Sequence, residues 1–320
     1  MTGMDNALAT VTVRVNRFTP RPERERAARG GSPFAKARRG GSPFGGGSAS
    51  SRNRRPRGKH WTQDYTLTVR PEDTVLDCLL TIKRTLDPTL AFRYSCGHGM
   101  CGSDAVAING TPTLLCTAGV KDWAKRPNQF AQTDAEGFRH TGDDATDEAA
   151  SGETPADGGA ANDLGVIELS PLPGFPVQRD LIADIDPMLD QIRKLKPYLQ
   201  ADGVLATTAE GKVDVFEYLQ NPEQLTKYEM LSNCIACGVC EGSCPVFAGG
   251  DAFIGPAALI AASRFVNDSR DTALDTRLDA IDTADGVAAC QSVRACSRHC
   301  PRGIDVGEEM WQIVAKVRER

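Results

Sequence analysis

Four cysteines between residues 234 and 244 have a spacing that indicates iron–sulfur chemistry. The segment CIACGVCEGSCP places Cys234, Cys237, Cys240 and Cys244 in a C-x2-C-x2-C-x3-C pattern, and Pro245 follows the last of them. Thiolates are soft ligands that favour iron–sulfur clusters or zinc over hard cations. Runs with this spacing are typical of [4Fe-4S] clusters, which exchange single electrons. The segment therefore predicts a redox centre.

A second run repeats this pattern with one substitution. The segment CQSVRACSRHCP, residues 290–301, has the same spacing, but an aliphatic residue, Val293, replaces one cysteine. In proteins with two such runs, the fourth cysteine of each run ligates the other cluster. Crossing the runs gives one complete [4Fe-4S] site, formed by Cys234, Cys237, Cys240 and Cys300. The other site receives Cys244, Cys290 and Cys296.

The fourth corner of that other site is Val293, which cannot bind iron. A cube without a thiolate at one iron tends to lose that iron, so the predicted species is [3Fe-4S]. Zinc or disulfides are the alternative, but they leave the matched spacings and the shared proline to chance.

A third cysteine group lies in CGHGMCGSDAVAINGTPTLLC. Its spacing, C-x4-C-x2-D with a distant cysteine, differs at one place from the C-x4-C-x2-C…C pattern of [2Fe-2S] ligands. The predicted ligands are Cys96, Cys101, Asp104 and Cys116. Asp104 could instead cap the turn. A buried cysteine-rich loop, or a zinc knuckle with His98, is the other interpretation, although zinc sites usually use C-x2-4-C pairs.

The glycines of this loop, Gly97, Gly99 and Gly102, predict a backbone that bends closely around a cluster, so that amide N–H groups reach its sulfur atoms. The eleventh cysteine, Cys78, falls on the apolar stripe of a predicted helix and is interpreted as a core residue.

The elements around the cysteines predict an α+β protein of two domains. Alternating patterns predict strands over 9–15 and 64–69, a further strand is predicted over 166–172, and a helix over 74–86. Beyond residue 184 helices are predicted over 186–199, 256–269 and 307–320. We expect a [2Fe-2S] domain over 1–183, with flexible inserted loops at about 19–60 and 124–163, and a helical domain over 184–320.

The composition of the chain is that of a globular protein without a membrane span. The 320 residues are 40% apolar and 25% charged, and the longest nearly unbroken apolar stretch, 253–262, is far shorter than the ~18 residues that a span requires. The first residues show no apolar signal segment, which predicts a cytoplasmic protein. Structural disulfides are disfavoured in that reducing compartment, so the eleven cysteines indicate clusters.

Two segments have the composition of flexible loops. Residues 21–60 hold twelve Lys and Arg against two Asp and Glu and repeat RGGSPF, whereas residues 134–163 hold nine acidic residues and one basic residue. An arm that binds nucleic acid or anionic lipid is the alternative for the basic segment. No aromatic platform is interleaved with its basic residues, so no nucleic-acid partner is expected.

Motifs around the three groups resemble the iron–sulfur subunit of succinate dehydrogenase, within the superfamily that includes fumarate reductase. They are FRYSCGHGMCGSD, PLPGFPVQRDL, FIGPAALIAASRF and DSRDTALDTRLD. The resemblance covers nearly the whole chain except the two loops. It implies a plant-type ferredoxin (β-grasp) domain followed by an all-helical, bacterial-ferredoxin-like domain.

The resemblance also implies a function. An FAD-containing flavoprotein subunit would oxidise succinate, and electrons would pass through the [2Fe-2S], [4Fe-4S] and [3Fe-4S] clusters to a membrane quinone, as in the tricarboxylic acid cycle and respiratory chain. Membrane-anchor subunits would hold the chain at the cytoplasmic face of the cell membrane. This subunit would form part of an oxidoreductase but supply no catalytic acid, base or nucleophile.

The family's quinone pocket borders the [3Fe-4S] site, where the resemblance implicates Pro245, Gln291 and Val293. Many family members have histidine in place of Gln291, and a tryptophan is expected where this chain has Gly249. Glutamine can hydrogen-bond a quinone carbonyl but cannot relay a proton as imidazole does. The alternatives are a fumarate reductase subunit and a free-standing soluble carrier; the helical tail and PLPGFPVQRDL argue against the carrier.

Overall fold

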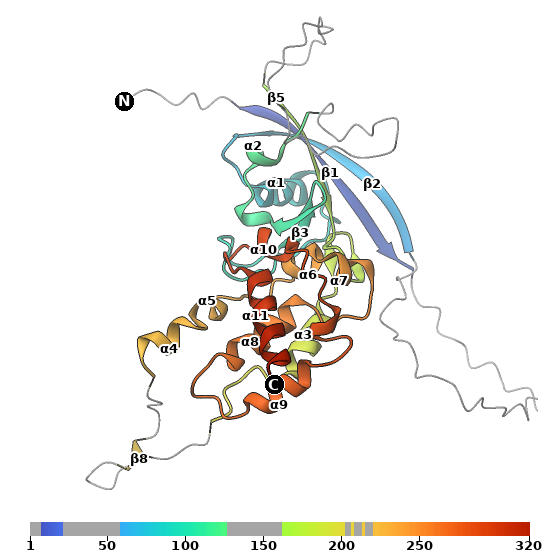
Figure 1. Ribbon diagram of the computed structural model, residues 1–320. Coiled ribbons are helices and arrows are strands. Elements are labelled where there is room, and N and C mark those ends of the chain that lie inside the picture. Colours follow the sequence, from blue (N-terminus) through green and yellow to red (C-terminus); the bar gives the residue numbers. More distant parts are fainter. Residues whose placement is uncertain (1–7, 22–57, 127–161, 202–205, 208–212, 215–219) are drawn as a thin grey trace, which may run out of the picture.

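The computed structural model describes residues 8–21, 58–126, 162–201, 206–207, 213–214 and 220–320. A sheet with a helix against it forms the N-terminal part, and helices form the C-terminal part beside it (Figure 1). Both segments interpreted as flexible loops lie, for most of their length, outside the described residues, as do residues 1–7. A mixed sheet followed by helices agrees with the predicted α+β class.

The sheet has five strands in the order β2-β1-β5-β3-β4. β1 runs antiparallel to β2 and parallel to β5, which pairs in turn with β3. The strands are β1 (Ala9–Pro20), β2 (Gly58–Val69), β3 (Ala105–Ile108), β4 (Thr111–Leu114) and β5 (Asp163–Ser170). Apolar side chains alternate along β1, so Val11, Val13 and Val15 face the core.

Backbone pairing extends slightly inside the approximate limits predicted for the two loops. β1 and β2 stay paired out to Pro20 and Gly58, so the loop predicted over 19–60 is shorter. Likewise Lys125 pairs with Val166 and β5 begins at Asp163, both inside the loop predicted over 124–163. On β1, the inward position after Val15 is occupied by a buried arginine.

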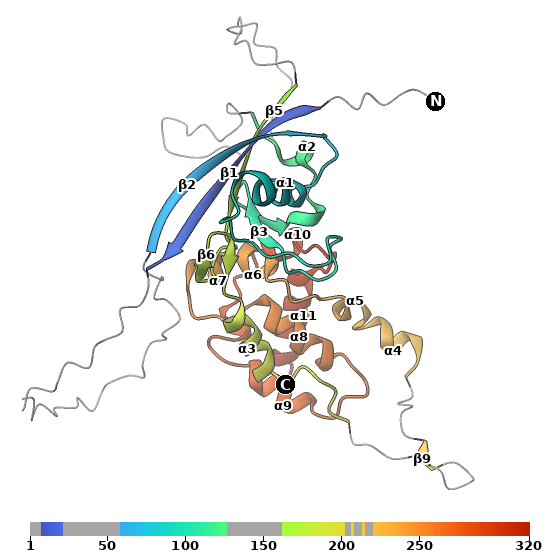
Figure 2. The ribbon, with the colours of Figure 1, turned by 180° about the vertical axis from the view of Figure 1, so that it is seen from behind.

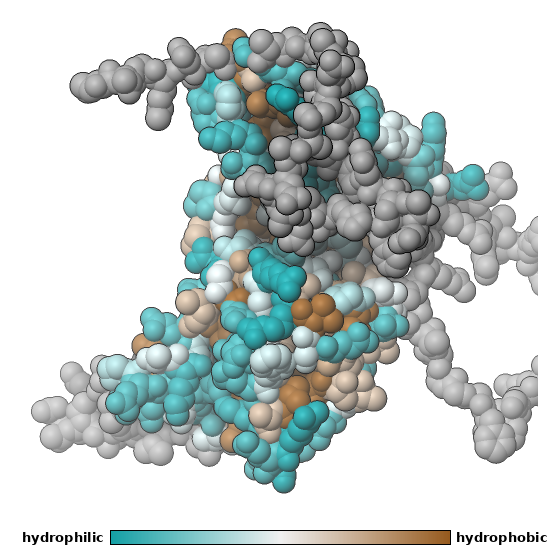
Figure 3. All heavy atoms as spheres, turned by 45° about the horizontal axis from the view of Figure 1, so that its top comes forward, coloured by the Kyte–Doolittle hydropathy of each residue, from teal (hydrophilic) through white to brown (hydrophobic). Residues whose placement is uncertain are grey.

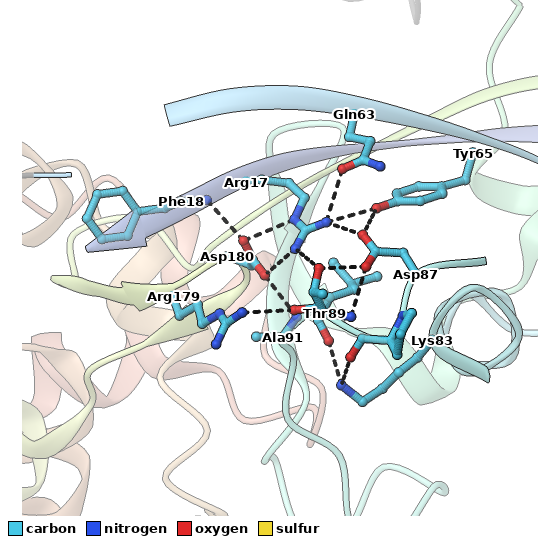
Figure 4. Close-up of polar contacts among 12 residues, drawn as sticks. Arg17, Phe18, Gln63, Tyr65, Lys83, Asp87, Thr89, Ala91, Arg179 and Asp180 are labelled. Carbon is cyan, nitrogen blue, oxygen red and sulfur yellow. Dashed lines mark hydrogen bonds and ion pairs between the residues drawn. The ribbon is translucent and has the colours of Figure 1, made fainter. Parts of the chain in front are cut away.

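That arginine, Arg17, lies in a polar network (Figure 4). Its guanidinium is 4% exposed and donates to both carboxylate oxygens of Asp180, each at 3.1 Å. It also pairs with Asp87 and donates to Tyr65. Burial alone would lower the pKa of Arg17, but its hydrogen bond to Asp180 and the other partners raise it above the ordinary value. The network ties β1 to the turn that contains Asp180, within the PLPGFPVQRDL segment.

A helix covers one face of the sheet (Figure 2). α1 (Val75–Thr81) begins with a capping box between Thr74 and Asp77 and continues as a π-helix, η2 (Ile82–Leu86). This confirms the helix predicted over 74–86. Cys78 is 1% exposed, and burial raises the pKa of its thiol to about 12. The prediction that Cys78 is a core residue is confirmed.

The C-terminal part is built from short helices. They are α3 (Asp186–Lys194), α4 (Pro222–Thr226), α5 (Glu229–Ser232), α6 (Val239–Ser243), α7 (Pro245–Gly249), α8 (Pro256–Val266), α9 (Leu274–Ile281), α10 (Ala295–Arg298) and α11 (Val306–Arg318). α3 ends before its predicted limit because Lys196 has a φ of 51° and Pro197 follows. α8 is surrounded by other elements, and its buried residues centre one hydrophobic core.

This part is not wholly helical. A two-stranded sheet pairs β8 (Ala206–Thr207) with β9 (Val213–Asp214), and a second sheet pairs β6 (Val177–Arg179) with β7 (Ile182–Ala183) near the junction of the two parts. The all-helical prediction is therefore corrected by the β8–β9 pair. Three further short elements are the one-turn helix α2 (Val120–Trp123) and the 3-10 turns η3 (Leu115–Thr117) and η5 (Val287–Ala289).

The surface seen in Figure 3 carries apolar residues in separate patches between hydrophilic ones. Exposed apolar side chains include Met100, Met230, Val293 and Trp311. Among the described residues, no helix has the length and apolar character needed to cross a membrane.

Candidate iron–sulfur sites

The loop between residues 93 and 104 brings the predicted ligands Cys96 and Cys101 close to a third, Cys116. Gly97, Gly99 and Gly102 have φ values of 74°, 76° and 68°, which confirms the tight backbone expected of them. The Gly99 amide donates to Cys116 Sγ at 3.2 Å, and the Met100 amide donates to Cys96 Sγ at 3.4 Å. Amide donors that point at sulfur favour the thiolate form, which is the form that binds iron.

Cys96 and Cys101 are neighbours within this loop. The Cys96 amide donates to Cys101 Sγ at 3.5 Å, and the Ser103 hydroxyl lies 3.1 Å from the same sulfur. Hydrogen bonds from the His98 amide and from Cys101 lower the pKa of the Cys96 thiol to about 7. The His98 ring instead contacts the Cys96 carbonyl oxygen, 2.7 Å from Nδ1.

Asp104 lies beside the third thiol. Its side chain is buried, and Oδ2 accepts the Cys116 amide at 2.7 Å. Its other oxygen, Oδ1, is buried without a hydrogen-bond partner among the described residues. Burial and the Asp104 carboxylate raise the pKa of the Cys116 thiol to about 12. One oxygen therefore holds the turn while the other is free, so capping and ligation are compatible in a single side chain.

The C-terminal cysteines form two separate groups. One cavity is lined by Cys234, Cys237, Cys240 and Cys300. A second cavity is lined by Cys244, Cys290 and Cys296, together with Pro245, Gln291 and Val293. Each cavity takes cysteines from both runs, so the fold brings together the groups that crossing the runs predicts. Ligation itself stays a prediction.

Burial dominates the chemistry of these thiols without metal. It raises the pKa of Cys237 and of Cys296 to about 11, and that of Cys240 well above its usual value. Neighbouring cysteines add to this, because thiolates placed close together repel one another. Positive iron would remove that repulsion, so the donor set fits clusters, whose ligands bind deprotonated.

The two cysteine runs share a backbone conformation that their sequences do not show. Cys237 stands between residues with φ values of 49° and 79°, and Val293 stands between residues with φ values of 57° and 62°. These flanking residues are Ala236, Gly238, Ser292 and Arg294. Three of them are not glycine, and such residues adopt positive φ only where the surrounding structure enforces it. Val293 therefore has the flanking backbone conformation of Cys237, a predicted ligand, without carrying a thiol.

No three Cys, His, Asp or Glu side chains in the described part of the chain converge closely enough to hold a single metal ion. The thiols instead surround the two cavities and the 93–104 loop. Thiolates that bind separate iron atoms of a cluster stand further apart than ligands that share one ion.

Two ionisable side chains near the cysteines were not anticipated. Glu241, beside Cys240, is fully buried, and its Oε1 accepts the Ala257 amide at the start of α8 at 3.0 Å. Burial raises the pKa of Glu241 to about 8. Arg302 lines the cavity of the complete cysteine set, with Nε buried and unpaired among the described residues. Position next to a cysteine run was the one available signal, and it does not distinguish these residues from exposed neighbours.

Comparison with known proteins gives the same organisation. A family described as 2Fe-2S iron-sulfur cluster binding domain matches residues 12–190, and one described as 4Fe-4S dicluster domain matches residues 230–304. The fumarate reductase iron-sulfur subunit of Mycobacterium tuberculosis is 33% identical over 243 residues, covering 76% of this chain and 80% of the relative. The chain belongs to the iron–sulfur subunit family of succinate dehydrogenases and fumarate reductases.

Other relatives of this family agree. The succinate dehydrogenase iron-sulfur subunit of Coxiella burnetii is 32% identical over 257 residues, covering 80% of this chain and 89% of the relative. The solved structure of the Mycobacterium smegmatis Sdh1 complex in the apo form contains a chain of the same fold, with a TM-score of 0.64, 21% identity and 98% of each chain covered. Membership of this family makes the chain an electron-transfer subunit of an oxidoreductase complex, with [2Fe-2S] and [4Fe-4S] binding domains.

Proposed function

We propose that this chain carries electrons from a flavoprotein subunit that oxidises succinate to a membrane quinone, through [2Fe-2S], [4Fe-4S] and [3Fe-4S] clusters. When bound, each cluster would accept and release one electron at a time. The observation that carries the proposal is the separation of seven cysteines into a set of four and a set of three.

Within this proposal, the chain's own residues hold and tune the clusters. Cys96, Cys101 and Cys116 would bind [2Fe-2S] with Asp104 Oδ1 as the fourth ligand, since that oxygen is buried and has no hydrogen-bond partner among the described residues. The sets lining the two cavities would bind [4Fe-4S] and [3Fe-4S]. Amide donors in the 93–104 loop would stabilise negative charge on sulfur.

The quinone would bind at the cavity of the three-cysteine set. Pro245, Gln291 and Val293 line that cavity, and all three side chains are exposed at its rim. The Gln291 amide is able to donate a hydrogen bond to a quinone carbonyl oxygen but not a proton, so water or another subunit would deliver protons. Anchor subunits would cover this rim and hold the chain at the cytoplasmic face of the membrane.

The finer fold assignments belong to the same proposal. Residues 1–183 would form a β-grasp, plant-type ferredoxin domain, and residues 184–320 a bacterial-ferredoxin-like domain with one short β pair. The mixed sheet crossed by α1 supports the first assignment, and the two crossed runs support the second.

Electron paramagnetic resonance (EPR) of the isolated complex tests this function. The air-oxidised complex is expected to show a sharp [3Fe-4S] signal that disappears when succinate is added. The signal's absence in complex with full iron content would contradict the assignment at Val293, and its persistence after succinate would contradict electron delivery from a succinate-oxidising partner.

Relatives named as fumarate reductase subunits make the reverse reaction a second candidate. Comparing succinate oxidation with fumarate reduction in the isolated complex, using quinones of high and low potential, decides between the two. A rate of fumarate reduction that exceeds succinate oxidation with both quinones would favour the second candidate.

A further inference from the structure

The 93–104 loop and the cysteine run over 234–244 are in direct contact at one glycine. Gly102 is buried, follows the predicted ligand Cys101, and has a φ of 68°. A Cβ atom placed on Gly102 would lie 2.5 Å from Cys237 Cβ and 3.0 Å from Cys237 Cα. Contacts shorter than 3.0 Å do not occur between real Cβ atoms and their neighbours. The backbone of the first loop thus touches a cysteine of the complete set with no side chain between them.

Further contacts hold the same two loops together. Gly102, Asp104 and Cys237 line one small cavity. Ile235 and Cys237 pack against the hydrophobic core of the N-terminal part. At the edge, Arg302 Nη1 lies 3.1 Å from Met100 Sδ, which joins the segment after Cys300 to the first loop. The approach at Gly102 is therefore fixed from both sides.

We propose that Gly102 is a positioning residue that sets the approach of the [2Fe-2S] and [4Fe-4S] clusters, and that electrons pass between them through the Cys101–Gly102 backbone and Cys237. This inference rests on the proposed function. With both clusters bound, one electron would leave the reduced [2Fe-2S] centre and reduce the oxidised [4Fe-4S] centre, and no bond would form or break. Tunnelling slows exponentially with distance, so even a small separation of the loops lowers the rate.

Position 102 requires glycine because there is no room for a side chain between the two loops. Any other residue would have to move the Cys237 backbone or the 93–104 loop, because the atoms in contact are Cys237 Cβ and Cα and not the end of a flexible side chain. The positive φ adds strain for other residues, but strain alone would not separate the clusters.

Gly102→Ala in the whole complex tests the proposal, with Gly110→Ala as the matched control. Gly110 also has a positive φ, 82°, but a Cβ there meets no atom of the described part of the chain within 4 Å. The control therefore introduces the same kind of backbone strain without pushing the loops apart. Freeze-quench EPR after succinate addition measures how fast the [4Fe-4S] centre is reduced, and the spin–spin interaction of the fully reduced centres reports their separation.

Gly102→Ala is expected to keep wild-type iron content, slow reduction of [4Fe-4S] several-fold and weaken the spin–spin interaction, while Gly110→Ala behaves as wild type. Equal rates and interactions in the two variants would overturn the proposal. If Gly102→Ala fails to assemble, wild-type complex decides: magnetically isolated reduced centres would overturn it, and strong interaction would support it. Wild-type complex that lacks either cluster would instead refute the proposed function.

Discussion

Val293→Cys would place a thiol where the flanking backbone already has the conformation found around Cys237. Residues of positive φ flank Val293 as they flank Cys237, so a thiol at position 293 would have the flanking backbone conformation of a predicted ligand. Val293 also lines the cavity with the three-cysteine set. The variant is expected to bind one additional iron per chain and to convert [3Fe-4S] to [4Fe-4S].

The stability of the protein should change little. The Val293 side chain is 51% exposed, and substitutions at such positions usually change the free energy of unfolding by no more than about 0.5 kcal/mol. Any large loss of cluster or activity therefore reports on the site itself and not on folding. Electron transfer to quinone is expected to fall, because the added thiolate and iron change the potential of the last centre.

Iron analysis and EPR of the air-oxidised complex measure this conversion. The [3Fe-4S] signal should be lost in Val293→Cys, because an oxidised [4Fe-4S] centre of this type gives no signal. Val293→Ala, at the same exposed position but without a thiol, should keep both signal and iron content. Val293→Cys complex with unchanged iron and an undiminished signal would refute the inference that this backbone position is a ligand position.

Three further outcomes follow from the buried polar groups. Asp180→Asn removes the fully buried carboxylate that pairs with Arg17, and Arg17 keeps its ion pair with Asp87. The free energy of unfolding should therefore fall by about 3 kcal/mol in denaturant titrations. A loss below about 1 kcal/mol would contradict the pairing. Burial and the hydrogen bond to Asp87 raise the pKa of Tyr65 to about 12, so the contribution of Tyr65 to the free energy of unfolding is complete below pH ~10 and lost as pH rises through 12. Tyr65→Phe should make this alkaline loss of stability shallower, by at most about 2–3 kcal/mol. An unchanged dependence of stability on pH would count against this role of Tyr65. Arg302→Met should lower the [4Fe-4S] potential by about 60 mV in redox titrations followed by EPR, if Nε donates to the cluster; an unchanged potential would exclude that donation.

Cysteine spacing anticipated which thiols the fold brings together because it reflects chain geometry over a few residues. The grouping across the two runs required a second rule that is not local, namely that the fourth cysteine of each run ligates the other cluster. The helix over 74–86 was, by contrast, local, because its cap and its apolar stripe both lie within the segment.

Features that depend on partners far apart along the chain could not be predicted from the sequence. Arg17 follows the inward alternation of β1, yet a charged residue signals the end of an apolar strand unless its partner is known. That partner, Asp180, lies far along the chain, and its role became visible only in the folded molecule. The contact of Gly102 with Cys237 likewise joins two loops whose proximity no local pattern encodes.

The exchange of cysteines between the two runs has a consequence for how the protein matures. Cys300 stands with the first run and Cys244 with the second, so each cavity is closed only when both segments are in place. Iron inserted at either site would cross-link the same two stretches of chain, and metal binding of this kind is also folding energy. Maturation of the helical part is therefore expected to be a single cooperative event, in which shortage of iron leaves the whole part unassembled and not one centre empty.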